Sequence, residues 1–116
     1  MPRLIEIRTY TIKRGRRESF HALVSQQSAP LLAAANIDVI AFGESVNDPD
    51  GYFLIRAFDD AKHLQSSQGA FYASDVWRDG PRAAVIDCIA NDANAVFWLT
   101  EQATEALRQS HLRTQA

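Results

Sequence analysis

The sequence predicts one α+β domain with a four-stranded antiparallel sheet in the split βαβ, or ferredoxin-like, arrangement. Three observations support this fold class. The chain has 116 residues, which is the usual size of a single domain. Its predicted elements follow the order strand, helix, strand, strand, helices, strand, helix, as in the split βαβ motif. Its strand segments carry apolar residues on both faces, although the main helices can cover only one face.

The first 36 residues have the patterns of one strand and one long helix. Residues 3–12 are rich in β-branched and aromatic types, which favours a strand. Apolar residues then recur at helical spacing, which predicts an amphipathic helix over residues 16–35. Pro30 lies inside this helix and removes one backbone donor, so we expect a kink or a break just before it. Asn36 is placed to end the helix in the left-handed backbone region.

A hairpin and a further helix are predicted to follow. Residues 37–46 and 51–58 have the composition of two strands, separated by the turn-forming run Asn47-Asp48-Pro49-Asp50-Gly51. Asp59 or Asp60 is suited to cap the next helix. Gly69 is expected to interrupt that helix, and a second helical piece is expected to continue beyond it.

The last part of the chain is predicted to contain one more helical piece, a strand and a terminal helix. Pro81 is suited to the first turn of the helical piece. Asn91 to Asn94 are expected to form a polar turn before the last strand, residues 95–99. Thr100 then caps a terminal helix that we expect over residues 100–112, with a narrow apolar stripe.

The strand sequences predict a sheet with a second apolar face that the main helices do not cover. Large exposed apolar faces are rare on soluble monomers, so this face needs a cover. The commonest cover is a second copy of the chain related by a two-fold axis. The terminal helix is the competing cover, but its stripe is too narrow to shield four strands. We therefore expect a homodimer joined through its sheet faces, with further assembly left open.

Composition and charge exclude several classes of function. The net charge of −2 gives no general attraction to nucleic acid or to an anionic membrane. Cys88 is the single cysteine and cannot form an internal disulfide. No apolar stretch approaches the ~20 residues of a membrane span, and the first residues lack the features of a signal peptide. We expect a cytoplasmic protein that binds neither nucleic acid nor membrane, with no metal site and no bound cofactor.

Two motifs resemble NIPSNAP-family domains. The first is Glu6-x-Arg8-Thr9-Tyr10-Thr11 followed by Lys13-x-Gly15, and the second is Ala70-Phe71-Tyr72-x-Ser74-x-x-Trp77-Arg78-x-Gly80-Pro81-Arg82. The similarity spans about residues 4–99. The resemblance implies a dimeric α+β barrel, in which two ferredoxin-like halves join sheet to sheet. It implies a NIPSNAP-like domain over residues 1–100, with residues 101–116 as a helical extension of the same domain.

The resemblance implies no particular reaction. Barrels similar to those of the NIPSNAP family include cofactor-independent monooxygenases, haem-degrading enzymes and lactone isomerases, and an activity does not transfer with a fold. The chain departs from the family pattern at Asn36, where glycine is more usual, and in its terminal helix.

Polar and aromatic side chains on the strands form the candidate ligand site. Glu6, Arg8 and Tyr10 are two residues apart, so they share one face of the first strand, and Tyr52 and Arg56 share a face of the third. If the two faces coincide, guanidinium and phenol groups could hold a carboxylate or an enolate. The alternative is a structural ion pair or solvent exposure at the rim of the sheet.

Trp77 and His63 complete the candidate set. Trp77 would form an apolar wall of the pocket, although such rings more commonly belong to the core. His63 would move a proton, because imidazole titrates near neutral pH. The alternative is that His63 is an ordinary helix residue of intermediate burial, and His21 has the same status with weaker support.

Two classes of function follow from these residues. The first is a NIPSNAP-like homodimer that binds a small anionic or aromatic ligand between sheet and helices; whether it is an enzyme stays open, and the enzyme would use no bound cofactor. The second is a non-catalytic protein-interaction module that uses the dimer edges or the terminal helix. A haem-binding relative is a third, weaker hypothesis. A closed cavity of roughly a few hundred Å³ with converging polar groups favours the first class.

Overall fold

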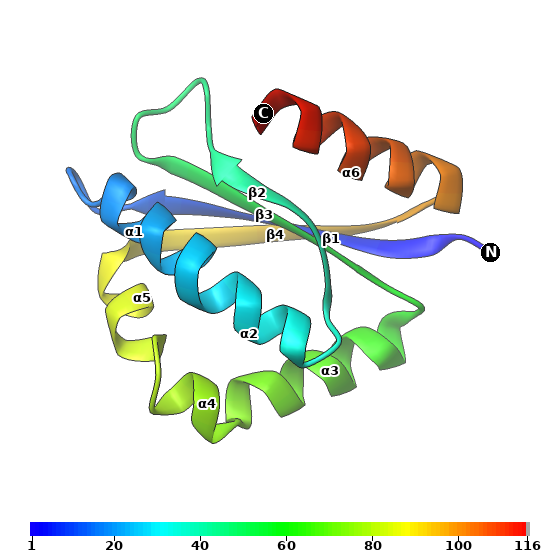
Figure 1. Cartoon of the computed structure of the whole chain (residues 1–116), viewed down its shortest axis with the longest axis horizontal. Coiled ribbons are helices and arrows are strands. Elements are labelled where there is room, and N and C mark those ends of the chain that lie inside the picture. The colour runs from blue at the N-terminus through cyan, green and yellow to red at the C-terminus, as the bar shows by residue number, and fades with distance from the viewer. Residues whose placement is uncertain (116) are drawn as a thin grey trace.

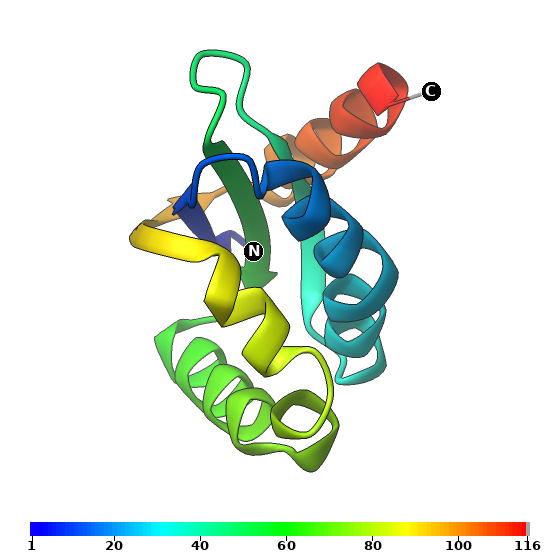
Figure 2. The ribbon, with the colours of Figure 1, turned by 90° about the vertical axis from the view of Figure 1, so that its left-hand side faces the viewer.

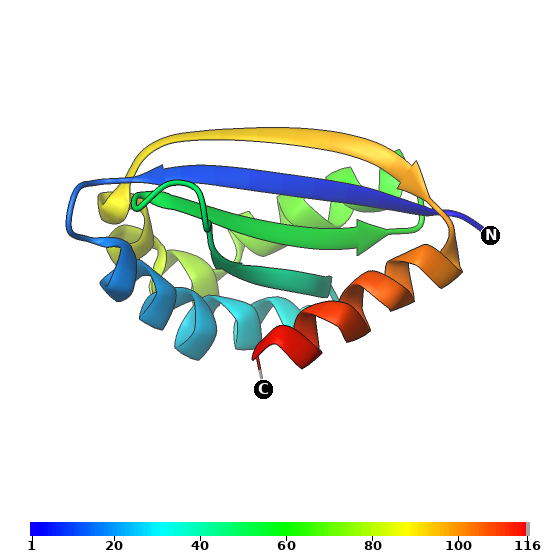
Figure 3. The ribbon, with the colours of Figure 1, turned by 90° about the horizontal axis from the view of Figure 1, so that it is seen from above.

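The computed structural model describes residues 1–115, which form a four-stranded antiparallel sheet with helices on both faces. The strands are β1 (Arg3–Ile12), β2 (Asp38–Glu44), β3 (Gly51–Phe58) and β4 (Ile89–Leu99). Their order across the sheet is β2-β3-β1-β4, with every neighbouring pair antiparallel (Figure 3). The predicted ferredoxin-like fold class is confirmed.

The helices divide between the two faces of the sheet (Figure 1). One face is covered by α1 (Arg17–Leu23), the π-helix η1 (Val24–Ser28), α2 (Ala29–Ala34), α3 (Ala61–Ala73), α4 (Asp75–Arg78) and α5 (Arg82–Cys88). We call this the helix face; Leu4, Tyr10 and Tyr52 point into it. The opposite, second face carries Ile5, Ile55 and Ala57, and α6 (Glu101–Gln115) packs against it.

A kink or a break was predicted just before Pro30; the helical run over α1, η1 and α2 instead changes its hydrogen-bonding pattern there. Proline has no backbone N–H, and its ring would collide with the carbonyl group one turn earlier in a regular α-helix. The wider π-turn of η1 separates these groups, so the chain continues into α2 without a break. The run ends at Asn36, whose φ of 61° lies in the left-handed region, as predicted.

Two boundary predictions were wrong. Gly69 does not interrupt a helix, because α3 runs through it from Ala61 to Ala73. A Cβ atom at Gly69 would meet nothing within 4 Å, so this glycine lies on an open side of the helix. Residues 91–94 do not form a turn either, since they pair with residues 8–11 of β1 as part of β4. Their polar character suits an edge strand that faces water.

The second face is only partly covered by α6. This helix lies along β2, where Arg108 donates to the carbonyl oxygen of Val39 at 3.1 Å and to Asp38 at 3.0 Å. The part of the second face near β4 lies beyond α6, and Phe97 there is 39% exposed. The next residue of β4, Trp98, points to the helix face and is 56% exposed. The β2–β3 loop extends on the same side of the sheet as α6 (Figures 1 and 2). No helix within residues 1–115 combines the length and the apolar character that crossing a membrane requires.

Candidate functional site

An enclosed cavity of about 40 Å³ lies between the helix face of the sheet and the helices. Its lining is aromatic and aliphatic, with a few hydroxyl groups: Tyr10, Phe20, Val24, Ser28, Leu32, Tyr52, Leu54, Phe71, Tyr72, Trp77 and Val85. The cavity lies where the sequence places the pocket, but it is smaller than the few hundred Å³ expected there. It has room for one or a few water-sized groups in the conformation described.

Three phenol side chains converge on this cavity. Tyr10 of β1 and Tyr52 of β3 are directly opposite each other in the strand register. The ring of Phe20 lies 5.4 Å from that of Tyr10 and 5.0 Å from that of Tyr52, so it fixes both. Tyr72 comes from α3, and its hydroxyl accepts a hydrogen bond from Nη1 of Arg56 at 2.8 Å. The cavity therefore has polar groups supplied by the sheet and by a helix.

Ser28 supplies a fourth hydroxyl group, which is buried. It is the last residue of η1, and its Oγ has no hydrogen-bond partner among residues 1–115. A helical serine can donate to the carbonyl four residues earlier, as Ser25 of the same π-helix does to His21 at 2.8 Å. Leaving a buried hydroxyl without a partner costs about 1–3 kcal/mol. Ser28 therefore offers an unused donor and acceptor to whatever occupies the cavity.

Burial keeps two of the phenols protonated. It raises the pKa of Tyr10 to about 12, with the nearby Tyr72 adding to the effect and Arg8 opposing it. Burial also raises the pKa of Tyr52, and the negative charge of Glu44 and the neighbouring Tyr10 increase the shift. Both groups therefore remain hydrogen-bond donors over the physiological pH range.

A charged network lies beside the cavity. The carboxylate of Glu6 accepts from Nε and Nη2 of Arg56 at 3.1 and 2.6 Å, and both side chains are almost completely buried. Glu6 also accepts from Gln68 at 2.7 Å, from Asn94 at 3.1 Å and from Arg8 at 3.2 Å. Burial alone would raise the pKa of Glu6, but the charge of Arg56 and these hydrogen bonds outweigh it and lower the pKa. Glu6 is therefore an ionised carboxylate that pairs with both Arg8 and Arg56.

The structure brings together three of the residues that the sequence singled out, since Tyr10, Tyr52 and Trp77 all line the cavity. Arg56 does not line it and instead lies behind Tyr72, while Arg8 pairs with Glu6. His63 is not brought to this cluster.

His63 has a local structural role at the start of α3. Its backbone N–H donates to the side chain of Asp60, which caps the helix as predicted, and its Nδ1 accepts from the N–H of Asp59 at 2.9 Å. Its ring packs against Phe58 with 5.6 Å between the centroids.

Sequence reasoning did not select Ser28 or Tyr72 for this site, and it gave His21 weaker support than His63. Ser28 carries no signal of its own, although the nearby Pro30 predicted the disturbed helix on which it lies. Tyr72 stands inside the second NIPSNAP-like motif, which was the available signal. His21 donates to or accepts from the Tyr52 hydroxyl, with 2.6 Å between Nδ1 and the oxygen, although 31 residues separate the two.

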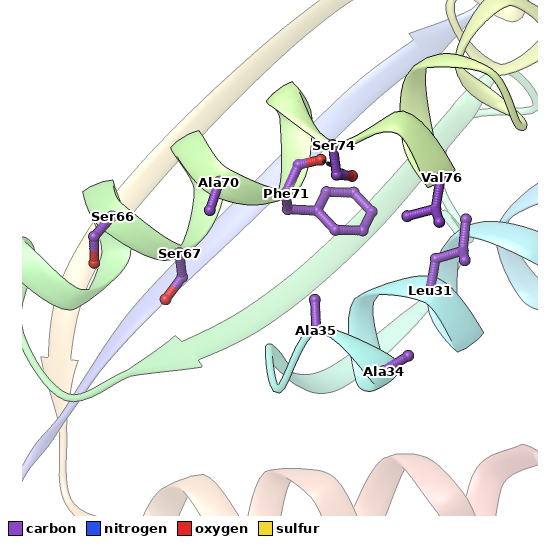
Figure 4. Close-up of a pocket in the computed structure, with 9 residues that line it drawn as sticks. All are labelled: Leu31, Ala34, Ala35, Ser66, Ser67, Ala70, Phe71, Ser74 and Val76. Carbon is purple, nitrogen blue, oxygen red and sulfur yellow. Dashed lines mark hydrogen bonds between the residues drawn. The ribbon is translucent and has the colours of Figure 1, made fainter.

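A wide groove lies on the other side of Phe71. It lies between α2 and the α3–α4 segment, has a volume of about 570 Å³ and is lined by small and apolar residues: Leu31, Ala34, Ala35, Ser66, Ser67, Ala70, Phe71, Ser74 and Val76 (Figure 4). Phe71 lines both the groove and the cavity. Its ring is thus a wall between the enclosed cavity and the open groove.

The residues of the site suit an organic ligand better than a metal ion. Within residues 1–115, no group of three or more His, Cys, Asp or Glu side chains could hold a metal. The cavity instead offers aromatic rings and hydroxyl groups, a lining that would suit an aromatic molecule with one or two polar atoms.

Comparisons with solved structures place this fold among known proteins. A NIPSNAP family protein from Agrobacterium tumefaciens matches with a TM-score of 0.78 and 15% identity, over 85% of this chain and 94% of that chain. A NIPSNAP domain protein from Burkholderia xenovorans matches with a TM-score of 0.75 and 14% identity, over 84% and 95% of the two chains. The chain has the NIPSNAP fold. The resemblance predicted from the two sequence motifs is thus confirmed at the level of the fold.

The NIPSNAP fold is shared with proteins of other names. A proposed antibiotic biosynthesis monooxygenase from Bordetella bronchiseptica matches with a TM-score of 0.63 and 21% identity, over 87% of this chain and 98% of that chain. No family model and no curated protein matches the sequence. At such identities the likeness establishes the fold alone, since one fold hosts many activities.

Proposed function

We propose that this chain is a NIPSNAP-like protein that binds a small aromatic molecule between its sheet and its helices. The observation that carries the proposal is the enclosed cavity, in which three phenols and the unpartnered hydroxyl of Ser28 converge. Tyr10 and Ser28 would hydrogen-bond the polar atom of the ligand, and Trp77 would pack against its ring. An anionic ligand is less well supported, because Glu6 already engages both Arg8 and Arg56.

Phe71 would control access to this site. An aromatic ring does not fit in about 40 Å³, but the groove beyond Phe71 offers about 570 Å³. Rotation of the Phe71 side chain would join the two spaces without moving the sheet. The ligand would then enter between α2 and α3, with its polar atom toward the phenols and its ring in the place of Phe71.

We further propose that two copies of the chain associate through the uncovered part of the second face. Phe97 of β4 supports this, because it is exposed on that face. The exposed Val96 and Trp98 lie on the opposite face of the same strand and make β4 a long apolar edge, which invites pairing with another chain. The same exposed strand is the observation that favours the second candidate function, an interaction module that binds a different protein. The mass of the purified protein tests the proposed self-association.

Ligand binding is tested by thermal unfolding with phenol and p-cresol as probes. Ser28→Val places two methyl groups in the cavity and removes the free hydroxyl, so the probes should no longer stabilise the protein. Ser25→Val is the matched control, because Ser25 lies on the same π-helix but outside the cavity. We expect both probes to raise the Tm of the wild type and of Ser25→Val. Equal stabilisation of Ser28→Val would contradict the proposed site.

A further inference from the structure

Tyr52 connects the enclosed cavity with a second space at the β2 edge of the sheet. Its ring lines the cavity, and its hydroxyl lies 2.6 Å from Nδ1 of His21. His21 in turn lines two open clefts between α1, η1, β2 and α6, of about 490 and 290 Å³. The hydrogen bond between the two side chains therefore crosses the wall that separates the cavity from outside water.

The chemistry of the pair assigns a direction to this hydrogen bond. Tyr52 is completely buried and keeps its proton, because both burial and Glu44 raise its pKa. A protonated phenol can donate its O–H, so we infer the tautomer of His21 in which Nδ1 is the acceptor and Nε2 carries the ring proton. The oxygen of Tyr52 retains lone pairs that can accept a proton from a group in the cavity.

The charged groups around His21 come from three elements. Glu44 of β2 lines one of the two clefts and is paired with Arg17 of α1 at 3.1 Å. Arg108 and His111 of α6 approach from the other side. Arg108 is itself paired with Asp38 at 2.9 Å. The arginine charges are thus balanced by carboxylates, and His21 has an open path to water through either cleft.

We propose that Tyr52 and His21 form a proton relay between the cavity and the outer cleft. The relay rests on the proposed function of the cavity and specifies its ligand class: an aromatic molecule with a weakly acidic O–H or an enolisable C–H. The ligand gives its proton to the Tyr52 oxygen, the Tyr52 proton moves to Nδ1 of His21, and the Nε2 proton of His21 leaves to water. The ligand remains as an enolate or phenolate, to which Tyr10 and Ser28 donate hydrogen bonds. Tyr52 need not become an anion in the buried cavity, because it gains one proton as it loses another.

The first test needs no ligand: exchange of the Tyr52 hydroxyl proton with water, measured by NMR in the wild type and in His21→Gln. The glutamine carbonyl can still accept the hydrogen bond of Tyr52 but cannot take up its proton. The relay predicts that exchange slows at least about tenfold in His21→Gln. His111→Gln is the matched control and should leave the exchange rate unchanged. A purely structural hydrogen bond would give equal or faster exchange in His21→Gln, and that result would overturn the relay.

The second test uses 4-nitrophenol, whose anion absorbs visible light. The relay predicts that, after a rapid rise in pH, the probe bound to His21→Gln ionises more slowly than the probe bound to the wild type. Equal rates of ionisation in both proteins would overturn the relay and leave the ligand site intact. A probe that binds neither protein would contradict the proposed ligand site, while the exchange measurement still decides the relay.

Discussion

Glu6 and Arg56 are charged side chains with exposures of 1% and 0% on the helix face of the sheet. They persist there because each satisfies the other: three donor side chains besides Arg56 complete the shell of the Glu6 carboxylate. The pair also has a consequence for the cavity, since Arg56 holds the hydroxyl of Tyr72 in place. One carboxylate thereby orders β1, β3, β4 and α3 around the candidate site.

Replacing this carboxylate should strongly destabilise the fold. Glu6→Gln leaves Arg56 buried without its counter-charge, so we expect a loss of about 3–5 kcal/mol in chemical denaturation. Glu105→Gln is the control, because it removes an exposed ion pair with Arg108 and should cost less than about 1 kcal/mol.

The pKa of Glu6 is lowered in the folded state, so the stabilisation that Glu6 gives is present above the ordinary pKa of a glutamate and is lost as the pH falls. The acid-unfolding curve of Glu6→Gln should accordingly be flatter, and two variants of equal stability would refute this account.

Tyr10 should make stability sensitive to alkaline pH. Its pKa is raised from 10.0 to about 12, so its contribution is full below pH 10 and is lost as the pH rises to 12. Over this range the wild type should lose roughly 2 kcal/mol more than Tyr10→Phe. Urea denaturation at several pH values between 9 and 12 measures the difference. Parallel pH profiles for the two proteins would show that the phenol is not shielded.

At the scale of single residues, the sequence predicted the sheet face of a side chain more successfully than its hydrogen-bond partners. The two-residue spacing correctly grouped Glu6, Arg8 and Tyr10 on one face of β1 and Tyr52 and Arg56 on one face of β3, and the structure shows that the two faces coincide. It could not show that Glu6 takes up both arginines, because Arg56 lies 50 residues away and Asn94 lies 88 residues away. The unpartnered state of Ser28 depends on packing and leaves no trace in the sequence.

At the scale of elements, the helical run before β2 is defined by its two irregularities. Pro30 imposes the π-turn that carries Ser28 at its end, and Asn36 stops the chain in the left-handed region. Backbone hydrogen bonds close this end, from Asn36 to Ala33 and from Ile37 to Leu32, both at 3.0 Å. The position of β2 and of the cavity wall therefore depends on this short turn.

The turn can be tested through Asn36. Alanine tolerates its φ of 61° less well, so Asn36→Ala should lose about 1 kcal/mol of unfolding free energy. Glycine adopts the same angle without a steric penalty, so Asn36→Gly should be at least as stable as the wild type. Thermal unfolding of the two variants provides the comparison. A loss as large in Asn36→Gly as in Asn36→Ala would show that the asparagine side chain, and not the backbone angle, matters here.

Most elements could be predicted from periodicity and capping residues. The predicted strand at residues 3–12 matches β1, and the predicted cap Thr100 accepts from the N–H of Ala103 at 3.1 Å. The predictions failed at exposed positions, where the residue type says little about the secondary structure. β4 is exposed along most of its length, so polar residues 91–94 fit it as well as apolar ones do. Gly69 likewise lies in α3 where no neighbour requires a side chain.

At the scale of the whole molecule, the two faces of the sheet are covered unequally. Five α-helices and η1 cover the helix face, whereas α6 covers the second face near β2 (Figure 1). The narrow stripe of α6 was predicted to be insufficient for four strands, and Phe97 on the β4 side of the second face is indeed exposed. In the proposed dimer, the partner would cover this remaining part of the sheet.

Self-association through β4 should be visible in the mass of the protein. Analytical ultracentrifugation should give twice the chain mass of 12.9 kDa for the wild type. Phe97→Glu places a charge on the proposed interface and should give the single-chain mass. Val46→Glu changes an exposed residue of the β2–β3 loop and should leave the mass unchanged. A wild type of single-chain mass at high concentration would contradict the dimer and favour the interaction module.

The most direct measurement of the central proposal is the position of a bound aromatic probe. Intermolecular NOEs from phenol to the methyl groups of a selectively labelled protein give this position. If the ligand binds between sheet and helices, phenol should show NOEs to Val24, Leu32 and Val85, which line the cavity. NOEs confined to Val96 on the exposed edge strand, or no NOEs at saturating phenol, would contradict it.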